Sequence, residues 1–149
     1  LVKVLDYLLP EGDLFRSVDY AGREEVDTSD ASCVELPMAV LVNEDSSSAA
    51  EFFAAALQEY EWATIVGSQT YGKGNFQTAF YLSDGSMVNL SIGKYYTPGG
   101  KSLSETGVTP DVVVDLDDEQ YALLYYNALE QADDPQFQAA IDTLTQKIS

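Results

Sequence analysis

Short apolar runs alternate with a helical pattern in the middle of this chain. The runs Leu36–Asn43 and Ala63–Gly67 are continuous and apolar, as expected for strands that are buried on both faces. Between them, in 48–60, apolar side chains recur at helical spacing. A strand, a helix and a strand in this order favour parallel pairing through a right-handed crossover. The pattern therefore predicts an α/β fold with layered sheets and packed helices.

The remaining segments predict helices and hairpins around this unit. Pro10 ends a first helix, and Ala21 and Gly22 form a turn sequence between two polar-apolar runs. We expect helices at 2–9, 119–132 and 135–148, hairpins at 14–28 and 76–97, and a strand at 111–116. A single partial domain would then consist of a lead-in helix and hairpin (1–35), a core (36–116) and C-terminal helices (117–149).

Composition limits the class of protein. The chain has 149 residues, of which 46% are hydrophobic, and is long enough for one globular domain with a core. Its 7 basic and 25 acidic residues give a formal net charge of −18. Because this charge repels phosphate, we expect neither a nucleic acid nor an anionic membrane surface as a partner. Since the chain opens directly on an amphipathic segment, we expect it to be part of a longer protein.

The sequence has no histidine and only one cysteine, Cys33. Without histidine, the chain has no Ser-His-Asp or Cys-His centre and no histidine-based metal site. A single cysteine likewise excludes an internal disulfide and a multi-cysteine zinc site. We therefore expect no metal or other cofactor. Any nucleophilic chemistry needs a lysine, a carboxylate or a group from another segment as its base.

A run of three serines, Ser46–Ser48, separates the first buried strand from the helix. Ser48 and Glu51 have the S-x-x-E spacing of a capping box, in which the serine side chain caps the helix. A serine at this junction is also well placed as a nucleophile, because the first N–H groups of the helix face a developing oxyanion. Spacing alone leaves both interpretations open.

The candidate base is Lys73, in the stretch TYGKGNFQ. Its flanking glycines permit unusual backbone angles, and Tyr71 and Phe76 offer apolar cover. A lysine acts as a base only when neutral. At pH 7 this requires its pKa to fall from about 10.4 by about three units, or roughly 4 kcal/mol of desolvation. The alternative is a simple glycine-rich turn; the phosphate-loop pattern G-x-x-x-x-G-K-[ST] is absent.

Four motifs follow one another between Leu36 and Val114: NEDSSSAAE, TYGKGNFQ, YYTPGG and GVTPD. Together they resemble the C-terminal processing, or tail-specific, serine peptidases of the Ser-Lys type. The family pattern around the nucleophile, N-x-x-S-A-S-A-S-E, differs here at Ser47 and Ala50. The resemblance implies a crotonase-like catalytic core, of which this chain is a fragment without the PDZ domain of the family.

The resemblance also implies a role for particular residues. Ser48 is then the nucleophile, Lys73 its general base, and Gln77 the residue that hydrogen-bonds and orients the lysine. The backbone N–H of Ala49 is one oxyanion donor. The implied substrates are proteins or peptides cut near their C-termini, outside the cytoplasm in the cell envelope or an organelle lumen.

Two upstream parts of this family are not in the sequence. One is a strand with an L-R-x-N-x-G-G type motif, which supplies the other oxyanion donor; the other is the PDZ domain, which captures substrate tails. We therefore expect the isolated chain to be weak or inactive as a peptidase, and an exposed sheet edge to favour homo-oligomers. The alternative function is a non-catalytic peptide-binding or assembly module on the same fold.

Overall fold

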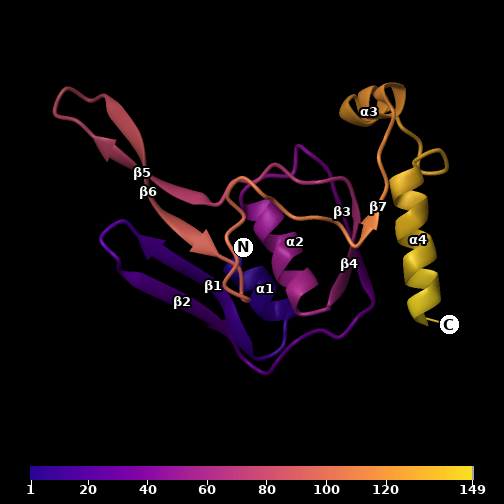
Figure 1. The fold of residues 1–149 in the computed structure, drawn as a ribbon, viewed down its shortest axis with the longest axis horizontal. Coiled ribbons are helices and arrows are strands. Elements are labelled where there is room, and N and C mark those ends of the chain that lie inside the picture. The colour runs from indigo at the N-terminus through magenta and orange to yellow at the C-terminus, as the bar shows by residue number, and fades with distance from the viewer. Residues whose placement is uncertain (149) are drawn as a thin grey trace.

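The computed structural model describes residues 1–148, which form two sheets and four helices (Figure 1). The helices are α1 (Val2–Leu8), α2 (Ala49–Glu59), α3 (Asp118–Tyr125) and α4 (Pro135–Ile148). The strands are β1 (Gly12–Asp19), β2 (Glu24–Ser29), β3 (Met38–Val42), β4 (Ala63–Gly67), β5 (Asn75–Tyr81), β6 (Met87–Tyr96) and β7 (Val112–Val113). Within residues 1–148, every helix is too short or too polar to cross a membrane. The predicted α/β class is confirmed.

The predicted strand–helix–strand unit forms a parallel sheet. β3 and β4 pair in parallel along their whole length, and β7 joins the other side of β4. In Figure 1, α2 lies to one side of these strands and α4 to the other, and both helices contact β3 and β4. This double cover explains the continuous apolar run of β4, in which the consecutive residues Ile65 and Val66 are both fully buried.

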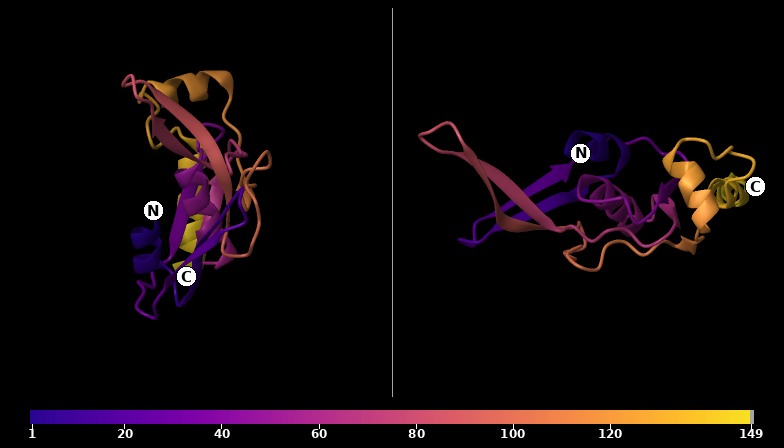
Figure 2. Two further views of the ribbon diagram at one scale, coloured as in Figure 1. Left: turned by 90° about the vertical axis from the view of Figure 1, so that its left-hand side faces the viewer. Right: turned by 90° about the horizontal axis from the view of Figure 1, so that it is seen from above.

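The two predicted hairpins join in one antiparallel sheet, with the strand order β2-β1-β6-β5. β1 pairs with β6, so the lead-in hairpin continues the sheet of the later hairpin. The β5–β6 hairpin extends well away from the rest of the chain (Figures 1 and 2). Between Phe76 and Gln77, near the base of this hairpin, a bulge shifts the register of β5.

The hydrophobic core lies where α1 and α2 pack against strands of both sheets. Phe52 and Leu57 of α2 are fully buried, which confirms the apolar face predicted for this helix. Phe52 also contacts Phe15 of β1 and Tyr95 of β6, and the ring centroids of these three residues are 5.0 to 5.8 Å apart. This aromatic cluster of Phe15, Phe52 and Tyr95 holds the start of α2 against the antiparallel sheet.

Two C-terminal elements are shorter than the sequence pattern predicts. The strand expected at 111–116 pairs only over Val112–Val113. The helix expected at 119–132 ends at Tyr125, because Asn127 adopts a left-handed backbone conformation, with a φ of 53°, that stops the helical repeat. The second C-terminal helix, α4, has the predicted bounds. The division of the chain into three segments stays a prediction.

Gly74 packs closely against a neighbouring loop, and we expect Gly74→Ala to destabilise the fold. A Cβ atom at this position would lie 2.5 Å from both the backbone nitrogen and the hydroxyl of Ser104. Relieving this contact requires a backbone shift that costs about 1–3 kcal/mol, which urea unfolding measures. As a control, the methyl group of Gly99→Ala meets only the Glu59 carboxylate, the end of a flexible side chain, and this variant should destabilise less. An unchanged free energy of unfolding for Gly74→Ala would contradict the close approach.

Candidate active site

Ser48 lies at the sharp junction where the chain leaves β3 and enters α2. It is the N-cap of α2, with φ of 57° and ψ of −118°, angles that an L-residue rarely adopts. The turn before it is held by Asn43, whose carbonyl oxygen accepts from the Ser46 N–H at 2.9 Å. The Asn43 N–H in turn donates to Ser46 Oγ at 3.1 Å. This strained strand-to-helix turn presents the Ser48 side chain beyond the carboxyl end of β3.

The capping and nucleophile interpretations of Ser48 are compatible in the structure. Ser48 and Glu51 are arranged as a capping box, in which the Ser48 N–H donates to Glu51 Oε2 at 2.8 Å. Ser48 Oγ faces the Glu51 N–H in the same box, but this contact lacks the geometry of a cap hydrogen bond. The backbone of Ser48 therefore supplies the firm capping contact, and its hydroxyl is available to the cavity.

Glu51 is a fully buried carboxylate that connects the serine and lysine segments. Its Oε1 accepts from Thr70 Oγ1 at 2.6 Å and from the Gly72 N–H at 2.5 Å. Its Oε2 accepts from the Ser48 N–H at 2.8 Å and the Lys73 N–H at 2.9 Å. These four donors offset the cost of burying the charge. Sequence spacing indicated only the local capping contact, because the other three partners lie 19 to 22 residues further along the chain.

Lys73 lies between two glycines whose geometry explains the GKG stretch. Gly72 has a φ of 91°, in the left-handed region, and Gly74 approaches Ser104 closely. The Lys73 side chain is exposed. Tyr71 is 69% exposed, so the expectation that it covers the lysine is wrong. Residues 1–148 therefore position the lysine backbone but do not enclose the side chain.

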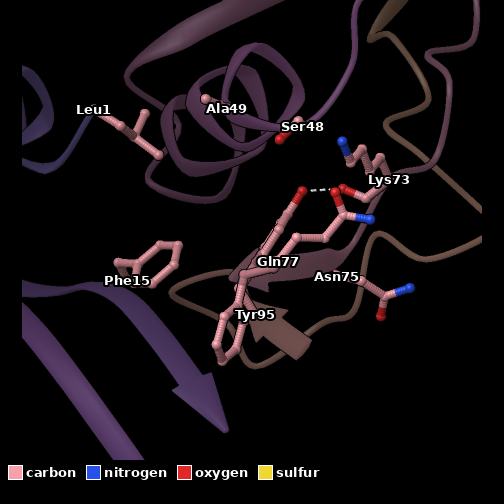
Figure 3. A pocket seen from close by; sticks show the side chains of 9 residues that line it. Leu1, Phe15, Ser48, Ala49, Lys73, Asn75, Gln77 and Tyr95 are labelled. Carbon is pink, nitrogen blue, oxygen red and sulfur yellow. Dashed lines mark hydrogen bonds between the residues drawn. The ribbon is translucent and has the colours of Figure 1, made fainter. Parts of the chain in front are cut away.

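A cavity of about 270 Å³ brings the four predicted site residues together. The predicted residues that line it are Ser48, Ala49, Lys73 and Gln77 (Figure 3). The rest of the wall is mostly apolar or aromatic and comes from Leu1, Phe15, Asn75, Phe76 and Tyr95. The serine, the start of α2 and the lysine side chain therefore line one space. Within residues 1–148 no hydrogen bond joins the Ser48 hydroxyl to the Lys73 amine, so their pairing as nucleophile and base stays a prediction. Among residues 1–148, no group of three or more His, Cys, Asp or Glu side chains is arranged to hold a metal ion.

Gln77 lines this cavity from β5, but its amide is bonded to the neighbouring strand. Gln77 Nε2 donates to Ser91 Oγ at 3.3 Å, and its Oε1 accepts from Asn89 Nδ2 at 3.2 Å. Both partners lie on β6, so the amide is engaged across the hairpin. The orienting role of Gln77 toward Lys73 stays a prediction.

Tyr95 is a residue of this site to which the sequence patterns assigned no role. It is 5% exposed, and its hydroxyl donates to the Lys73 carbonyl oxygen, as the dashed line in Figure 3 shows. Burial raises the pKa of the Tyr95 phenol, a hydrogen bond with Ser48 lowers it, and the charge of Glu51 raises it. Its place in the YYTPGG motif was the available signal.

The third and fourth motifs anchor the loops around the two ends of α2. Thr70, which donates to the buried carboxylate near the start of α2, accepts from the Val108 N–H of GVTPD at 2.7 Å. Thr97 of YYTPGG donates from Oγ1 to Glu59 Oε1, near the end of α2, at 2.9 Å. GVTPD therefore has a structural role near the site, whereas YYTPGG anchors the far end of α2 through Thr97 and reaches the site through Tyr95.

The turn before Ser48 is also tied to α3. The Tyr121 hydroxyl donates to Asp45 Oδ2. This hydrogen bond is the main cause that raises the pKa of Tyr121 to about 12, with desolvation and the charges of Asp45 and Glu44 adding to it. The first C-terminal helix therefore contacts the serine turn even though it contributes no buried residue to the core.

Comparison with known sequences identifies the family. The pattern of peptidase family S41 matches residues 1–114. The chain is 37% identical over 138 residues to the carboxyl-terminal-processing protease of Synechocystis sp., covering 92% of this chain and 31% of that protein. It is 38% identical over 116 residues to the chloroplastic C-terminal processing peptidase of Tetradesmus obliquus, covering 76% of this chain and 25% of that protein.

Comparison with solved structures points to the same family. The photosystem II D1 C-terminal processing protease matches with a TM-score of 0.70 and 38% identity, covering 76% of this chain and 30% of that chain. An S41 protease from Bacteroides fragilis matches over 99% of this chain and 41% of that chain, with a TM-score of 0.71; at 18% identity it shows the fold alone. This chain belongs to peptidase family S41, which confirms the resemblance. It spans 31% and 27% of the length of two curated relatives.

Proposed function

We propose that this chain is the serine endopeptidase core of a C-terminal processing peptidase, with Ser48 as nucleophile and Lys73 as general base. The observation that carries the proposal is the single cavity lined by both side chains. The relatives, which are named carboxyl-terminal processing proteases, support the reaction class. The absence of histidine supports an unusual base.

In the proposed reaction, neutral Lys73 accepts the hydroxyl proton of Ser48 while Ser48 Oγ attacks the carbonyl carbon of the scissile peptide bond. The backbone N–H of Ala49 donates to the oxyanion that forms. Collapse of this intermediate breaks the C–N bond, and the lysine gives the proton to the leaving amine, which leaves an ester on Ser48. Lys73 then removes a proton from water while the water oxygen attacks the ester carbon. The bond from this carbon to Ser48 Oγ breaks, and Lys73 returns the proton to Oγ. Gln77 would orient the lysine.

The isolated chain would be a weak or inactive enzyme. Lys73 is exposed, so residues 1–148 do not shield its side chain from water as a general base would require. The full-length relatives are several times longer than the matched region, which supports a partner segment, upstream in the same protein, that covers the lysine. The same segment would supply a second oxyanion donor, whose loss costs about 10²–10³ in rate.

The names of the relatives also support a substrate class and a place of action. Proteins or peptides cut near their C-termini fit the name carboxyl-terminal-processing protease. The chloroplastic name of one relative supports work in an organelle lumen or, in a bacterium, in the cell envelope. Association into homo-oligomers stays a prediction. For the isolated chain, the exposed Lys73 favours the alternative, a non-catalytic peptide-binding module.

Labelling with a fluorophosphonate tests the proposal, because this probe reacts with an activated serine hydroxyl. In a longer chain with the upstream segment, we expect Ser48→Ala to abolish labelling. Ser47→Ala, which removes the adjacent hydroxyl, should keep it. The 149-residue chain should be labelled at least about 10²-fold more slowly than the longer one, because it lacks one oxyanion donor.

The outcomes of this labelling experiment distinguish the role of Ser48 from the weak activity of the shorter chain. Labelling of the longer chain that survives Ser48→Ala would contradict the assignment of the nucleophile. Equal labelling of the two chains would contradict the weak activity of the shorter one but not the role of Ser48. A longer chain that binds peptide C-termini without any labelling or cleavage would support the binding module instead.

A further inference from the structure

Tyr95 is fixed in the core by its ring and its backbone. The ring centroid lies 5.8 Å from that of Phe15 and 5.7 Å from that of Phe52. The Tyr95 N–H donates to the Gly74 carbonyl oxygen at 3.1 Å, next to the lysine in the chain. Because the side chain is only 5% exposed, the place of its hydroxyl is determined by packing and not by a mobile loop.

The hydroxyl of Tyr95 contacts the lysine segment, and the residue shares a cavity with Ser48. It donates to the Lys73 carbonyl oxygen (Figure 3), and Tyr95, Ser48 and Lys73 all line the candidate active-site cavity. A phenol has one hydrogen to donate. Since that hydrogen goes to the Lys73 carbonyl, the phenol oxygen can serve the Ser48 hydroxyl only as an acceptor. Ser48 is also one of the groups that shift the pKa of the Tyr95 phenol, which it lowers.

We propose that Tyr95 is a positioning residue for the peptidase reaction, whose hydroxyl holds the Lys73 segment beside the start of α2 and orients the Ser48 hydroxyl in the cavity. This inference rests on the proposed function, because it concerns the pairing of Ser48 with Lys73. The Tyr95 hydroxyl and the Glu51 carboxylate bind different groups of these segments. Glu51 accepts from backbone N–H groups of the two segments, whereas Tyr95 binds the Lys73 carbonyl oxygen and lines the cavity with Ser48.

The rate of the reaction depends on how accurately the reacting groups are placed. A shift of about 1 Å in a reacting group can cost about 10²-fold in rate. Tyr95→Phe keeps the ring in the aromatic cluster but removes the hydroxyl. The Lys73 carbonyl then loses its donor, and under the proposal the Ser48 hydroxyl loses the acceptor that orients it. The variant thus separates the positioning role of the hydroxyl from the packing role of the ring.

The contact with Ser48 can be tested in the 149-residue chain without any enzymatic activity. Tyrosines carrying ¹³C at Cζ are titrated by NMR, and Tyr95→Phe identifies the Tyr95 signal. We expect Ser48→Ala to raise the pKa of the Tyr95 phenol, because the phenolate loses a donor. Ser47→Ala should leave this pKa unchanged. If the two serine variants titrate alike, the contact and the inference are overturned.

The positioning role is tested by kinetics in the longer chain. We expect Tyr95→Phe to lower kcat by about 10- to 100-fold while KM stays within about twofold, because the residue orients the reacting pair and does not bind substrate. Tyr96→Phe is the matched control, since Tyr96 is the next residue of the same strand and lines a different cavity, with Arg16 and Pro98. If Tyr95→Phe retains the kcat of Tyr96→Phe, the positioning role is overturned.

The two arms separate failure of the inference from failure of the proposed function. If turnover survives Ser48→Ala, the proposed function fails, while the NMR arm still decides whether Tyr95 contacts Ser48. If turnover depends on Ser48 and Tyr95→Phe is fully active, only the inference fails. Tyr95→Phe is also assayed at a lower temperature, at which it is as stable as the wild-type chain. If its kcat is restored there, the residue has a merely structural role, and the inference is overturned.

Discussion

Lys73→Arg is expected to abolish Ser48-dependent turnover in a longer chain, lowering kcat/KM by about 10²–10⁴-fold. Arginine keeps the positive charge and the reach of lysine, but its guanidinium is not deprotonated in proteins and so does not accept the Ser48 proton. Lys73→Ala should be as inactive as Lys73→Arg. The measurement is kcat/KM on a peptide substrate, together with the rate of fluorophosphonate labelling.

A control for these lysine variants lies on the adjacent strand. Lys94 of β6 is also exposed, pairs in the sheet opposite Asn75 and is not among the residues that line the cavity. We expect Lys94→Ala to keep wild-type turnover, so that a loss in the Lys73 variants is not a general effect of charge. If Lys73→Arg is active, the charge of the residue is what matters, and the general-base assignment is wrong.

Glu51→Gln is expected to impair both stability and activity. All four contacts of the carboxylate are with donors, namely the N–H groups of Ser48, Gly72 and Lys73 and the Thr70 hydroxyl. An amide replaces one acceptor oxygen with an NH₂ group, which leaves two of these buried donors without an acceptor. At about 1–3 kcal/mol for each unsatisfied group, the free energy of unfolding should fall by about 2–6 kcal/mol. Urea unfolding measures this loss.

The activity of Glu51→Gln should fall by more than the loss of folded protein explains, because Glu51 connects the segments that carry Ser48 and Lys73. Labelling is therefore measured at a temperature at which the variant is folded by circular dichroism. Glu59→Gln is the matched control, since Glu59 lies on the same helix and accepts from Thr97 and Gly99, away from the cavity. A folded Glu51→Gln variant with the labelling rate of Glu59→Gln would contradict the connecting role of Glu51.

Local patterns in the sequence were sufficient for much of the fold. The strands β3 and β4 and the stripe of α2 were predicted correctly, and β4 is buried as the pattern requires. The prediction that the first run is buried on both faces is wrong, because β3 is an edge strand in which Leu41 is 42% exposed. The predictions were less accurate for β7 and α3. There the extent of the element depends on partners that are distant in sequence and on the left-handed Asn127, which no periodic pattern indicates.

The sequence by itself determined the family and the α/β class, and it indicated Ser48 and Lys73 as candidate residues whose roles stay predictions. It did so because a candidate nucleophile, a candidate base and the glycines around them are recognisable from residue type and local spacing. Only the tertiary structure decided that both side chains line one cavity, that Glu51 binds both segments, that Tyr95 binds the Lys73 carbonyl, and that Lys73 is exposed. These features depend on contacts between residues about 20 or more positions apart, and on solvent access, which are properties of the packed chain and not of any local stretch.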